Sequence, residues 1–358
     1  MSATLRPVPE TAAPRDLRKM ALDPDHWYPL ARASDLKPGS TLAVTYAGQE
    51  IVLVRGERGA LYALEDRCAH RQVPLSKGVV KGDRLQCNYH CWTFEKTGRC
   101  VSVPYLDEDK REPVSVKAFA AKEAYGFIWV FPGDQTKADS VPMPDIPAYA
   151  DDEYKTRILD RRIDCHWSFM HENLMDMNHQ FLHRRLMGKI KATLQDVRSG
   201  DDFVEAEYTF SRLSGRQSFG EKIMVGSGRK KNAGRDRDHM VIRTHYPYQS
   251  LQFWVAGKDK PALDLWNFYM PTDADQRKNQ TYGLMMIRKP PKFPGLMTAV
   301  WPLVVWFTES IFAEDEDIVE QEQRAHDMQG ADENREVFPP IIALKELLTD
   351  CSSPIEGR

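Results

Sequence analysis

Residues 68–100 of the chain read CAHRQVPLSKGVVKGDRLQCNYHCWTFEKTGRC, and this stretch decides the fold of the N-terminal third. It holds two cysteine–histidine pairs, Cys68 with His70 and Cys87 with His90. Two thiolates and two imidazoles suit a tetrahedral zinc ion, and they equally suit a [2Fe–2S] cluster in which two histidines replace two cysteines on one iron. Structural zinc sites more often separate the cysteines from the histidines. The mixed pairs therefore favour a cluster, with both cysteines on one iron and both histidines on the other.

The sequence around these pairs has the pattern of short antiparallel strands. Residues 41–68 alternate apolar and polar side chains and contain turn signals at Ala47-Gly48 and at Gly56–Gly59. Further short apolar runs follow at 84–86, 100–104 and 126–130. We therefore predict a small all-β domain over residues 27–132, with both pairs on loops between its strands.

The quoted stretch resembles the cluster-binding region of Rieske proteins, and in particular of Rieske non-heme iron oxygenases. The four candidate ligands have the spacing of that family and are followed by Trp92-Thr93-Phe94. Proline is usual in the family where this chain has Asn88, and glycine where it has Cys91; neither position is a ligand. The resemblance thus implies a Rieske [2Fe–2S] cluster, and its ligands in this chain are Cys68, His70, Cys87 and His90.

A second group of candidate ligands lies in residues 166–188, which read HWSFMHENLMDMNHQFLHRRLMG. We predict one helix from His166 to Met187, ended by Gly188. Asp176, His179 and His183 are three and four residues apart, which on an α-helix places them on one face. Two imidazoles and one carboxylate form the facial triad that holds Fe(II) with open positions. A solvated polar face of the helix is the alternative interpretation.

The same family resemblance extends to this second motif. In the family, Asp-x2-His is followed three or four residues later by His, and a carboxylate from a later helix completes the site. Residues 311–323, IFAEDEDIVEQEQ, have the form of that later helix. The resemblance implies that Fe(II) is held by His179, His183 and Asp315, with Glu314 and Asp317 as the neighbours to consider in place of Asp315.

The resemblance also implies an architecture and an assembly. The fold class is α+β: a small all-β Rieske domain followed by a helix-grip catalytic domain, an antiparallel sheet with helices. Three chains form a head-to-tail ring, so that each cluster faces the iron of the neighbouring chain. Asp176 then is not an iron ligand but bridges His179 of its own chain and His90 of the neighbour, as carboxylates that orient ligating imidazoles do.

The remaining segments complete the predicted domain organisation. Residues 1–26 are interpreted as a mobile N-terminal arm, 133–150 as a linker, and 151–354 as the catalytic domain, with strands in 190–288 and a charged helix at 314–328. The last four residues, 355–358, read IEGR and look like a protease-recognition remnant.

Composition limits the class of protein. The chain has 358 residues, 42% apolar and 28% charged, as expected for a soluble globular protein of about two domains. The formal net charge of −3 argues against a nucleic-acid partner. Six cysteines and the lack of a signal-peptide pattern favour a cytoplasmic protein. The apolar run 296–307 contains Pro302 and is too short to span a bilayer, so we predict a buried segment.

These features predict an enzyme. The chain contains no G-x-G-x-x-G nucleotide motif, so we expect a terminal oxygenase that uses O2 and receives electrons from a separate reductase or ferredoxin. Two alternatives stay open: a Rieske electron carrier, which would need only residues 27–132, and a ligand-binding relative that has lost its chemistry.

The substrate is predicted from large apolar side chains on the strands and on the helix before Asp315. Small-molecule pockets are mostly apolar, so we expect monooxygenation of an apolar ring compound, by hydroxylation or by O- or N-demethylation. The candidate wall residues are Phe203, Tyr208, Phe210, Phe253, Trp254, Trp266, Phe268, Met285, Met286, Trp301, Trp306 and Phe307.

Overall fold

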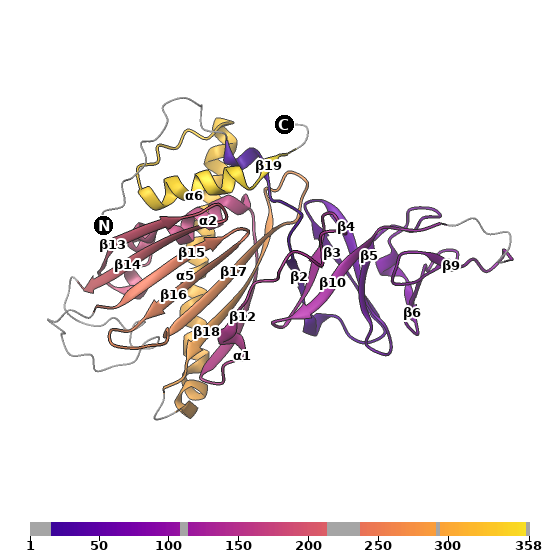
Figure 1. Cartoon of the computed structure of the whole chain (residues 1–358), viewed down its shortest axis with the longest axis horizontal. Coiled ribbons are helices and arrows are strands. Elements are labelled where there is room, and N and C mark those ends of the chain that lie inside the picture. Colours follow the sequence, from indigo (N-terminus) through magenta and orange to yellow (C-terminus); the bar gives the residue numbers. More distant parts are fainter. Residues whose placement is uncertain (1–15, 108–113, 213–236, 291–293, 356–358) are drawn as a thin grey trace.

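A computed structural model describes residues 16–107, 114–212, 237–290 and 294–355 of the chain. The described residues form an all-β N-terminal domain and a larger domain in which helices cover an antiparallel sheet (Figure 1). The predicted α+β class is confirmed.

The N-terminal domain contains two antiparallel sheets. The six-stranded sheet has the order β2-β11-β10-β5-β4-β3 and the four-stranded sheet the order β6-β7-β8-β9. Their strands are β2 (Tyr28–Arg32), β3 (Ser40–Tyr46), β4 (Gln49–Arg55), β5 (Leu61–Glu65), β6 (Val79–Lys81), β7 (Arg84–Gln86), β8 (Thr93–Phe94), β9 (Cys100–Ser102), β10 (Ala118–Ala124) and β11 (Phe127–Phe131). Two short 3₁₀ helices join them, η2 (Ala33–Asp35) and η3 (Leu75–Lys77).

Strand β4 shows how period-two alternation builds this domain. Successive side chains of a strand point to opposite faces of the sheet. Ile51 and Leu53 lie in the main core of the molecule, whereas Val52 and Val54 lie in a second core that also contains both cysteines of the cluster motif. The six-stranded sheet is thus buried on both faces, which fixes the loops that carry the cysteine–histidine pairs.

The C-terminal domain is built on a seven-stranded antiparallel sheet of order β12-β18-β17-β16-β15-β14-β13. The prediction of strands within residues 190–288 is confirmed, and the edge strand β12 was not predicted. The strands are β12 (Tyr154–Ile163), β13 (Ile190–Ser199), β14 (Phe203–Arg212), β15 (His239–His245), β16 (Tyr248–Trp254), β17 (Leu263–Pro271) and β18 (Asn279–Arg288).

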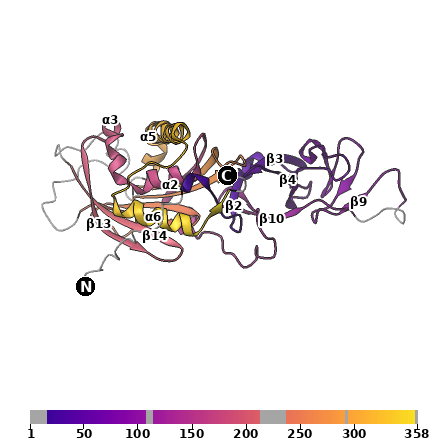
Figure 2. The ribbon, with the colours of Figure 1, turned by 90° about the horizontal axis from the view of Figure 1, so that it is seen from above.

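Helices α2, α5 and α6 cover the sheet, and α2 and α5 lie on the same side of it in Figure 2. Their arrangement brings the end of α2 next to the middle of α5. The helices are α1 (Pro147–Ala150), α2 (Trp167–Met175), the 3₁₀ helix η5 (Met177–Phe181), α3 (Arg184–Met187), α5 (Pro294–Gln329) and α6 (Pro339–Asp350).

The two domains share one apolar contact. Phe127 and Trp129 of β11 pack edge-on against aromatic rings of the large sheet, with Trp129 5.0 Å from Phe268 between ring centroids. Tyr248 and Tyr282 complete this aromatic cluster. All of these side chains are buried, so the contact packs the N-terminal domain against the seven-stranded sheet.

The interpretation of residues 1–26 as a mobile arm is wrong for residues 16–26, and residues 1–15 lie outside the described part. Leu17, Met20 and Leu22 are buried in the main core. The 3₁₀ helix η1 (Leu17–Lys19) is followed by β1 (Met20–Ala21), which pairs with β19 (Ser353–Pro354) near the C-terminus. Three apolar residues at suitable spacing thus anchor a segment that its prolines and charges suggested was exposed. Ile355 of the IEGR sequence is also buried, and 356–358 lie outside the described residues.

The prediction that residues 296–307 form a buried segment is also wrong. They form the first half of α5, whose second half contains the predicted helix 314–328. Val304 and Phe307 are buried, but Leu296 and Trp306 are 52% and 54% exposed. Among the described residues, α5 is the one helix long and apolar enough to cross a membrane by length and composition. An apolar composition does not specify which face of a helix packs against the rest of the protein. In the first half of α5, one face is left uncovered.

Arg18 ties the N-terminal segment to α2. Its side chain is 1% exposed, its guanidinium lies 2.6 Å from Glu172, it bonds Ser168, and it stacks on Phe169 at 3.6 Å. We expect Arg18→Met to lower the free energy of unfolding by about 3 kcal/mol, because it removes a buried charge and leaves the half-buried carboxylate of Glu172, whose Oε1 atom is buried, unpaired.

Urea denaturation of the Arg18→Met variant checks this prediction. The matched control is Arg58→Met, because Arg58 is 81% exposed and also pairs with a carboxylate, Asp83. An exposed pair contributes at most about 1 kcal/mol. Equal losses of stability in the two variants would contradict a structural role for Arg18.

Candidate metal centres

Each cysteine–histidine pair lies on a short loop closed by a backbone hydrogen bond. The Cys68 amide donates to the Val73 carbonyl at 2.9 Å, and the Cys87 amide donates to the Trp92 carbonyl at 2.8 Å. Both cysteines are 1% exposed and lie in the second core. The two thiols therefore face inwards, as a buried sulfur-ligated iron requires.

The two histidines lie on the outer side of the same loops. The rings of His70 and His90 meet at 4.5 Å between centroids, and Trp92 stacks on His70 at 4.7 Å with an interplanar angle of 3°. The Nδ1 atom of His70 is buried and has no hydrogen-bond partner among the described residues. Two buried sulfurs thus lie below two half-buried imidazoles, one of which has an unpartnered nitrogen. This arrangement fits a [2Fe–2S] cluster whose histidine-ligated iron lies near the surface.

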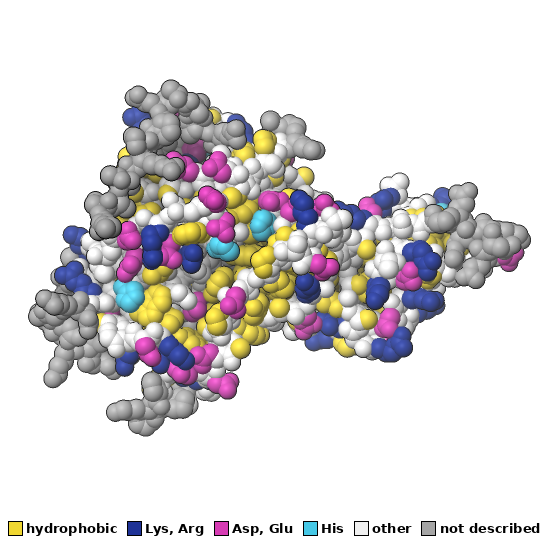
Figure 3. All heavy atoms as spheres, viewed as in Figure 1, with side chains coloured by type: hydrophobic (Ala, Val, Ile, Leu, Met, Phe, Trp, Pro, Cys, Tyr) yellow, Lys and Arg dark blue, Asp and Glu magenta, His cyan; other side chains and the backbone are white. Residues whose placement is uncertain are grey.

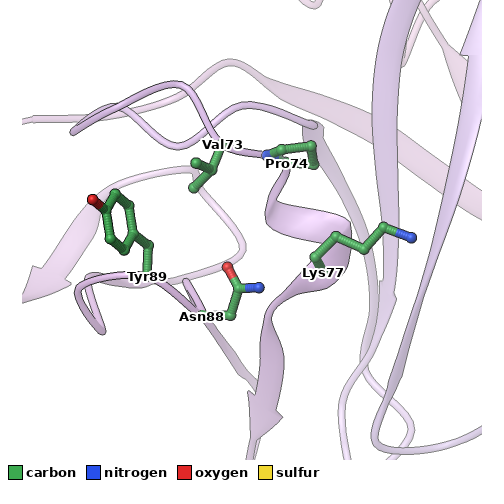
Figure 4. Close-up of a pocket in the computed structure, with 5 residues that line it drawn as sticks. All are labelled: Val73, Pro74, Lys77, Asn88 and Tyr89. Carbon is green, nitrogen blue, oxygen red and sulfur yellow. The ribbon is translucent and has the colours of Figure 1, made fainter.

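A shallow hollow adjoins the cluster loops. It has a volume of about 440 Å³ and is lined by Val73, Pro74, Lys77, Asn88 and Tyr89 (Figure 4). Tyr89 is 57% exposed and its ring lies against His90, 3.7 Å between centroids. The residue next to a cluster ligand thus presents an aromatic surface to whatever molecule contacts this end of the domain.

The second motif does not form the single helix predicted from His166 to Met187. Helix α2 ends at Met175, and Asp176 adopts an extended conformation with φ −87° and ψ 92°. Its carboxylate accepts a hydrogen bond from the Asn178 amide at 2.8 Å and thereby caps η5. An aspartate that bonds the backbone two residues ahead competes with helix formation, so the chain turns at Asp176 although it has no proline or glycine there.

The broken helix nevertheless brings the two histidines together with Asp315 of α5. One nitrogen of each histidine and one carboxylate oxygen of Asp315 all lie within 4.8 Å of one another. The Oδ1 atom of Asp315 is 3.1 Å from Nε2 of His183 and 3.9 Å from Nε2 of His179. His183 and Asp315 are buried and His179 is half-buried.

The other nitrogen of each histidine is already bonded, which aims the free one at the site. Nδ1 of His179 lies 2.5 Å from the Asp176 carbonyl oxygen, and Nδ1 of His183 lies 2.7 Å from Oε2 of Glu314. The buried atoms His183 Nε2 and Asp315 Oδ1 have no hydrogen-bond partner of acceptable geometry. The free nitrogens of the two histidines and the Asp315 oxygen thus point towards one another without forming hydrogen bonds. Oxygen acceptors hold both imidazoles in this orientation. The arrangement fits a divalent metal held by two histidines and one carboxylate.

The neighbours of Asp315 have different surroundings. Glu314 contacts His183 on its far nitrogen and so orients that imidazole. Asp317 is exposed and accepts a hydrogen bond from Gln321 on the same helix. The contact between Glu314 and His183 was not predicted, because 131 residues separate the two in sequence.

The strands divide the predicted wall residues between the two faces of the sheet. Tyr208 bonds the Met175 carbonyl of α2, and Phe210 and Phe253 lie together on that same helix-covered face. Phe268 instead packs against the N-terminal domain, and Trp306 is exposed. Only part of the predicted set is therefore available to a pocket between the sheet and α5.

Iron binding at the His179–His183–Asp315 site is expected to weaken as the pH falls. Burial alone would lower the pKa of His183, but the nearby carboxylates of Asp315 and Glu314 outweigh burial and raise its pKa above the usual 6.5. A metal must displace that proton, so the apparent affinity for Fe(II) should fall about tenfold for each pH unit below the raised pKa. Anaerobic competition with an iron chelator between about pH 8 and pH 6 measures this, with cluster absorbance as control. An affinity independent of pH would contradict the prediction.

Comparison with known protein families matches both domains. The Rieske [2Fe-2S] domain matches residues 26–120, and the vanillate O-demethylase oxygenase C-terminal domain matches residues 163–339. The chain is 30% identical to 4beta-methylsterol monooxygenase of Methylococcus capsulatus, over 97% of this chain and 94% of that protein. It is 25% identical to the vanillate O-demethylase oxygenase subunit of a Pseudomonas species, over 83% and 85% of the two chains.

Solved structures show the same fold. Dicamba monooxygenase bound to 3,6-dichlorosalicylic acid superposes with a TM-score of 0.73 at 22% identity, covering 92% of this chain and 98% of that chain. Zinc in the N-terminal site and a protein that only carries electrons are both excluded, since the N-terminal match is to a [2Fe–2S] domain and the second domain matches an oxygenase. The chain, with its [2Fe–2S] cluster domain and its mononuclear iron domain, belongs to the Rieske non-heme iron oxygenases.

Proposed function

We propose that this oxygenase hydroxylates or oxidatively demethylates an apolar ring compound, and that a methylated polycyclic alicyclic compound such as a sterol is the first candidate. The observation that carries the proposal is the 30% identity to a 4beta-methylsterol monooxygenase along almost the whole of both chains. The half-buried aromatic side chains on the helix-covered face, Phe210 and Phe253, support an apolar pocket.

In this proposal each metal group has a defined set of residues. Fe(II) is held by His179, His183 and Asp315, and the cluster is held by Cys68, His70, Cys87 and His90. When bound, the cluster supplies electrons and the iron activates O2. Glu314 and the Asp176 carbonyl hold the iron-binding imidazoles in position.

The working assembly in this proposal is a head-to-tail ring of three chains. Figure 1 places β6, beside the cluster loops, at the opposite end of the molecule from α2, and Figure 2 shows α3 in the same far half as α2. Helices α2 and α3 flank the iron-binding histidines. Apolar side chains are exposed at both ends: Tyr89 and Tyr105 near the cluster, and Phe181, 55% exposed, near the iron. Exposed aromatic residues beside both metal sites support a contact between the cluster end of one chain and the iron end of the next.

The electron donor in this proposal is a separate acidic reductase or ferredoxin. Lys and Arg side chains are spread over the N-terminal domain in Figure 3. The exposed basic residues there include Arg58, Lys81, Arg84, Lys96 and Arg99. Such a surface favours association with a negatively charged partner. None of the six cysteines, all of which lie within the described residues, forms a disulfide, which supports a reducing compartment such as the cytoplasm.

A substrate panel tests the proposed reaction. The enzyme and a surrogate reductase are incubated with 4-methylsterols, methoxyaromatics and N-methyl compounds, and coupled O2 uptake and product mass are recorded. We expect turnover of at least one ring compound with a product that gains one oxygen atom or loses a methyl group. Turnover confined to a small quaternary ammonium compound or an aliphatic zwitterion would refute the proposal, because neither would use the apolar wall.

A further inference from the structure

We propose that the first half of α5, from Leu296 to Phe307, docks on the surface of a lipid bilayer, from which the enzyme takes its substrate. The inference rests on the proposed function, since an apolar polycyclic substrate partitions into bilayers rather than into water. What suggests it is the uncovered apolar face of α5.

Four exposed or half-buried apolar side chains of this half-helix form one stripe. Leu296, Ala299, Leu303 and Trp306 follow at intervals of three, four and three residues, which places them on one face of an α-helix. Leu303 is half-buried and the other three are exposed. Met297, Val304 and Phe307 lie on the other side and are buried. Of the most apolar 18-residue window of α5, 22% is buried, which is far less than a core helix of a globular protein would show.

The stripe suits the surface of a bilayer and not its interior. No charged residue occurs between Leu296 and Thr308, a length of about 18 Å at 1.5 Å per residue, whereas a span needs about 20 apolar residues. The helix then continues into Glu309, which bonds Arg157 and Arg161 of β12, and into Asp315 of the iron site. Because its second half is held in the catalytic domain and its first half is too short to span, the first half would lie along the membrane surface.

The border of the stripe is basic and aromatic. The Lys155 ammonium lies 4.6 Å from the centre of the Trp301 ring, and Lys289, whose ammonium donates to the Asp152 carbonyl, lies just before α5. Tryptophan and lysine beside an apolar helix face are typical of helices that bind at the headgroup level, where lysine meets lipid phosphate. Complementarity between these basic side chains and phosphate favours an anionic bilayer as the occupant.

A second copy of the chain is a less suitable occupant. The proposed ring uses the surfaces beside the two metal sites, whereas Leu296 lies 19 residues before Asp315, or about 28 Å along the helix. Trp306 is nine residues before Asp315, about 13 Å away along the axis. Docking would therefore place the bilayer beside the helix that leads to the iron, while the ring contact stays free.

Vesicle flotation of the holoenzyme tests the docking. Vesicles of phosphatidylcholine with phosphatidylglycerol are compared for the natural chain and for a Leu296→Glu/Trp306→Glu variant. We expect the natural chain to float with the vesicles and the variant to lose at least about tenfold in partitioning, because two large apolar side chains are replaced by charges. The matched control is Met328→Glu/Val337→Glu, two exposed apolar residues away from the stripe, 82% and 84% exposed. It should float like the natural chain.

Three results would overturn the docking proposal: no flotation of the natural chain, equal flotation of the two double variants, or a smaller oligomer for the stripe variant in sedimentation. The last would assign the stripe to contacts between copies. Iron content and cluster absorbance show whether each variant is folded.

Turnover measurements with two ways of delivering the sterol distinguish the docking proposal from the proposed function. With a 4-methylsterol embedded in vesicles, the stripe variant should be at least about tenfold slower than the control variant, matching its loss of partitioning. With the same sterol delivered by cyclodextrin, the two should be equal. If no ring compound is turned over but the natural chain still floats, the proposed function fails and the docking stands.

Discussion

Replacing Asp315 by alanine should remove the mononuclear iron and leave the [2Fe–2S] cluster in place. Two imidazoles without the carboxylate hold Fe(II) poorly. Loss of residues that only orient a ligand already costs about 10–100-fold, so turnover should fall by more than about 100-fold. Iron analysis should drop from about three to about two irons per chain, with unchanged cluster absorbance.

Asp317→Ala is the matched control for this experiment. Asp317 lies on the same helix, is exposed, and bonds Gln321 rather than either histidine. It should keep three irons and full turnover. If Asp315→Ala instead keeps its third iron, Asp315 is not the ligand, and Glu314, 2.7 Å from the other nitrogen of His183, is the next residue to replace.

The prediction from sequence was most complete where the chemistry is local. The cysteine–histidine pairs lie within 23 residues of chain, and their spacing carries the information about the cluster. The same holds for the short strands around them, because alternation is a property of neighbouring residues. Asp315 is different: it lies 132 residues after His183, and only the family resemblance connected the two.

Two predictions failed for physical reasons that a linear pattern does not contain. The helix through Asp176 breaks because a side chain bonds the backbone ahead of it, a choice that helical spacing alone does not reveal. The apolar run before Thr308 is too short to span a bilayer, which predicts a buried segment, but burial depends on a partner surface. In the fold, α5 finds such a surface on one side only.

Asp176→Asn should reduce turnover by about 10–100-fold while both metal sites stay filled. The hydrogen bonds of Asp176 within its own chain are ones that asparagine can also make. Oδ1 of Asp176 accepts from the Asn178 amide, and the Asp176 carbonyl oxygen faces His179. Asparagine keeps the carbonyl and a side-chain oxygen, so the turn that carries His179 is preserved.

What asparagine loses is the negative charge and the second side-chain oxygen. In the proposed ring that oxygen accepts a hydrogen bond from the neighbouring chain's His90, and an amide NH2 in its place can only donate. The expected defect is therefore slow transfer of electrons between chains, measured as cluster reoxidation in a single turnover with substrate bound. Asp317→Asn, which changes an exposed carboxylate on α5, should behave like the natural chain. Normal reoxidation in Asp176→Asn would exclude the bridge but would not contradict the trimer. Sedimentation of a fully active monomer would exclude the ring itself, because a single chain has no neighbouring cluster to face its iron.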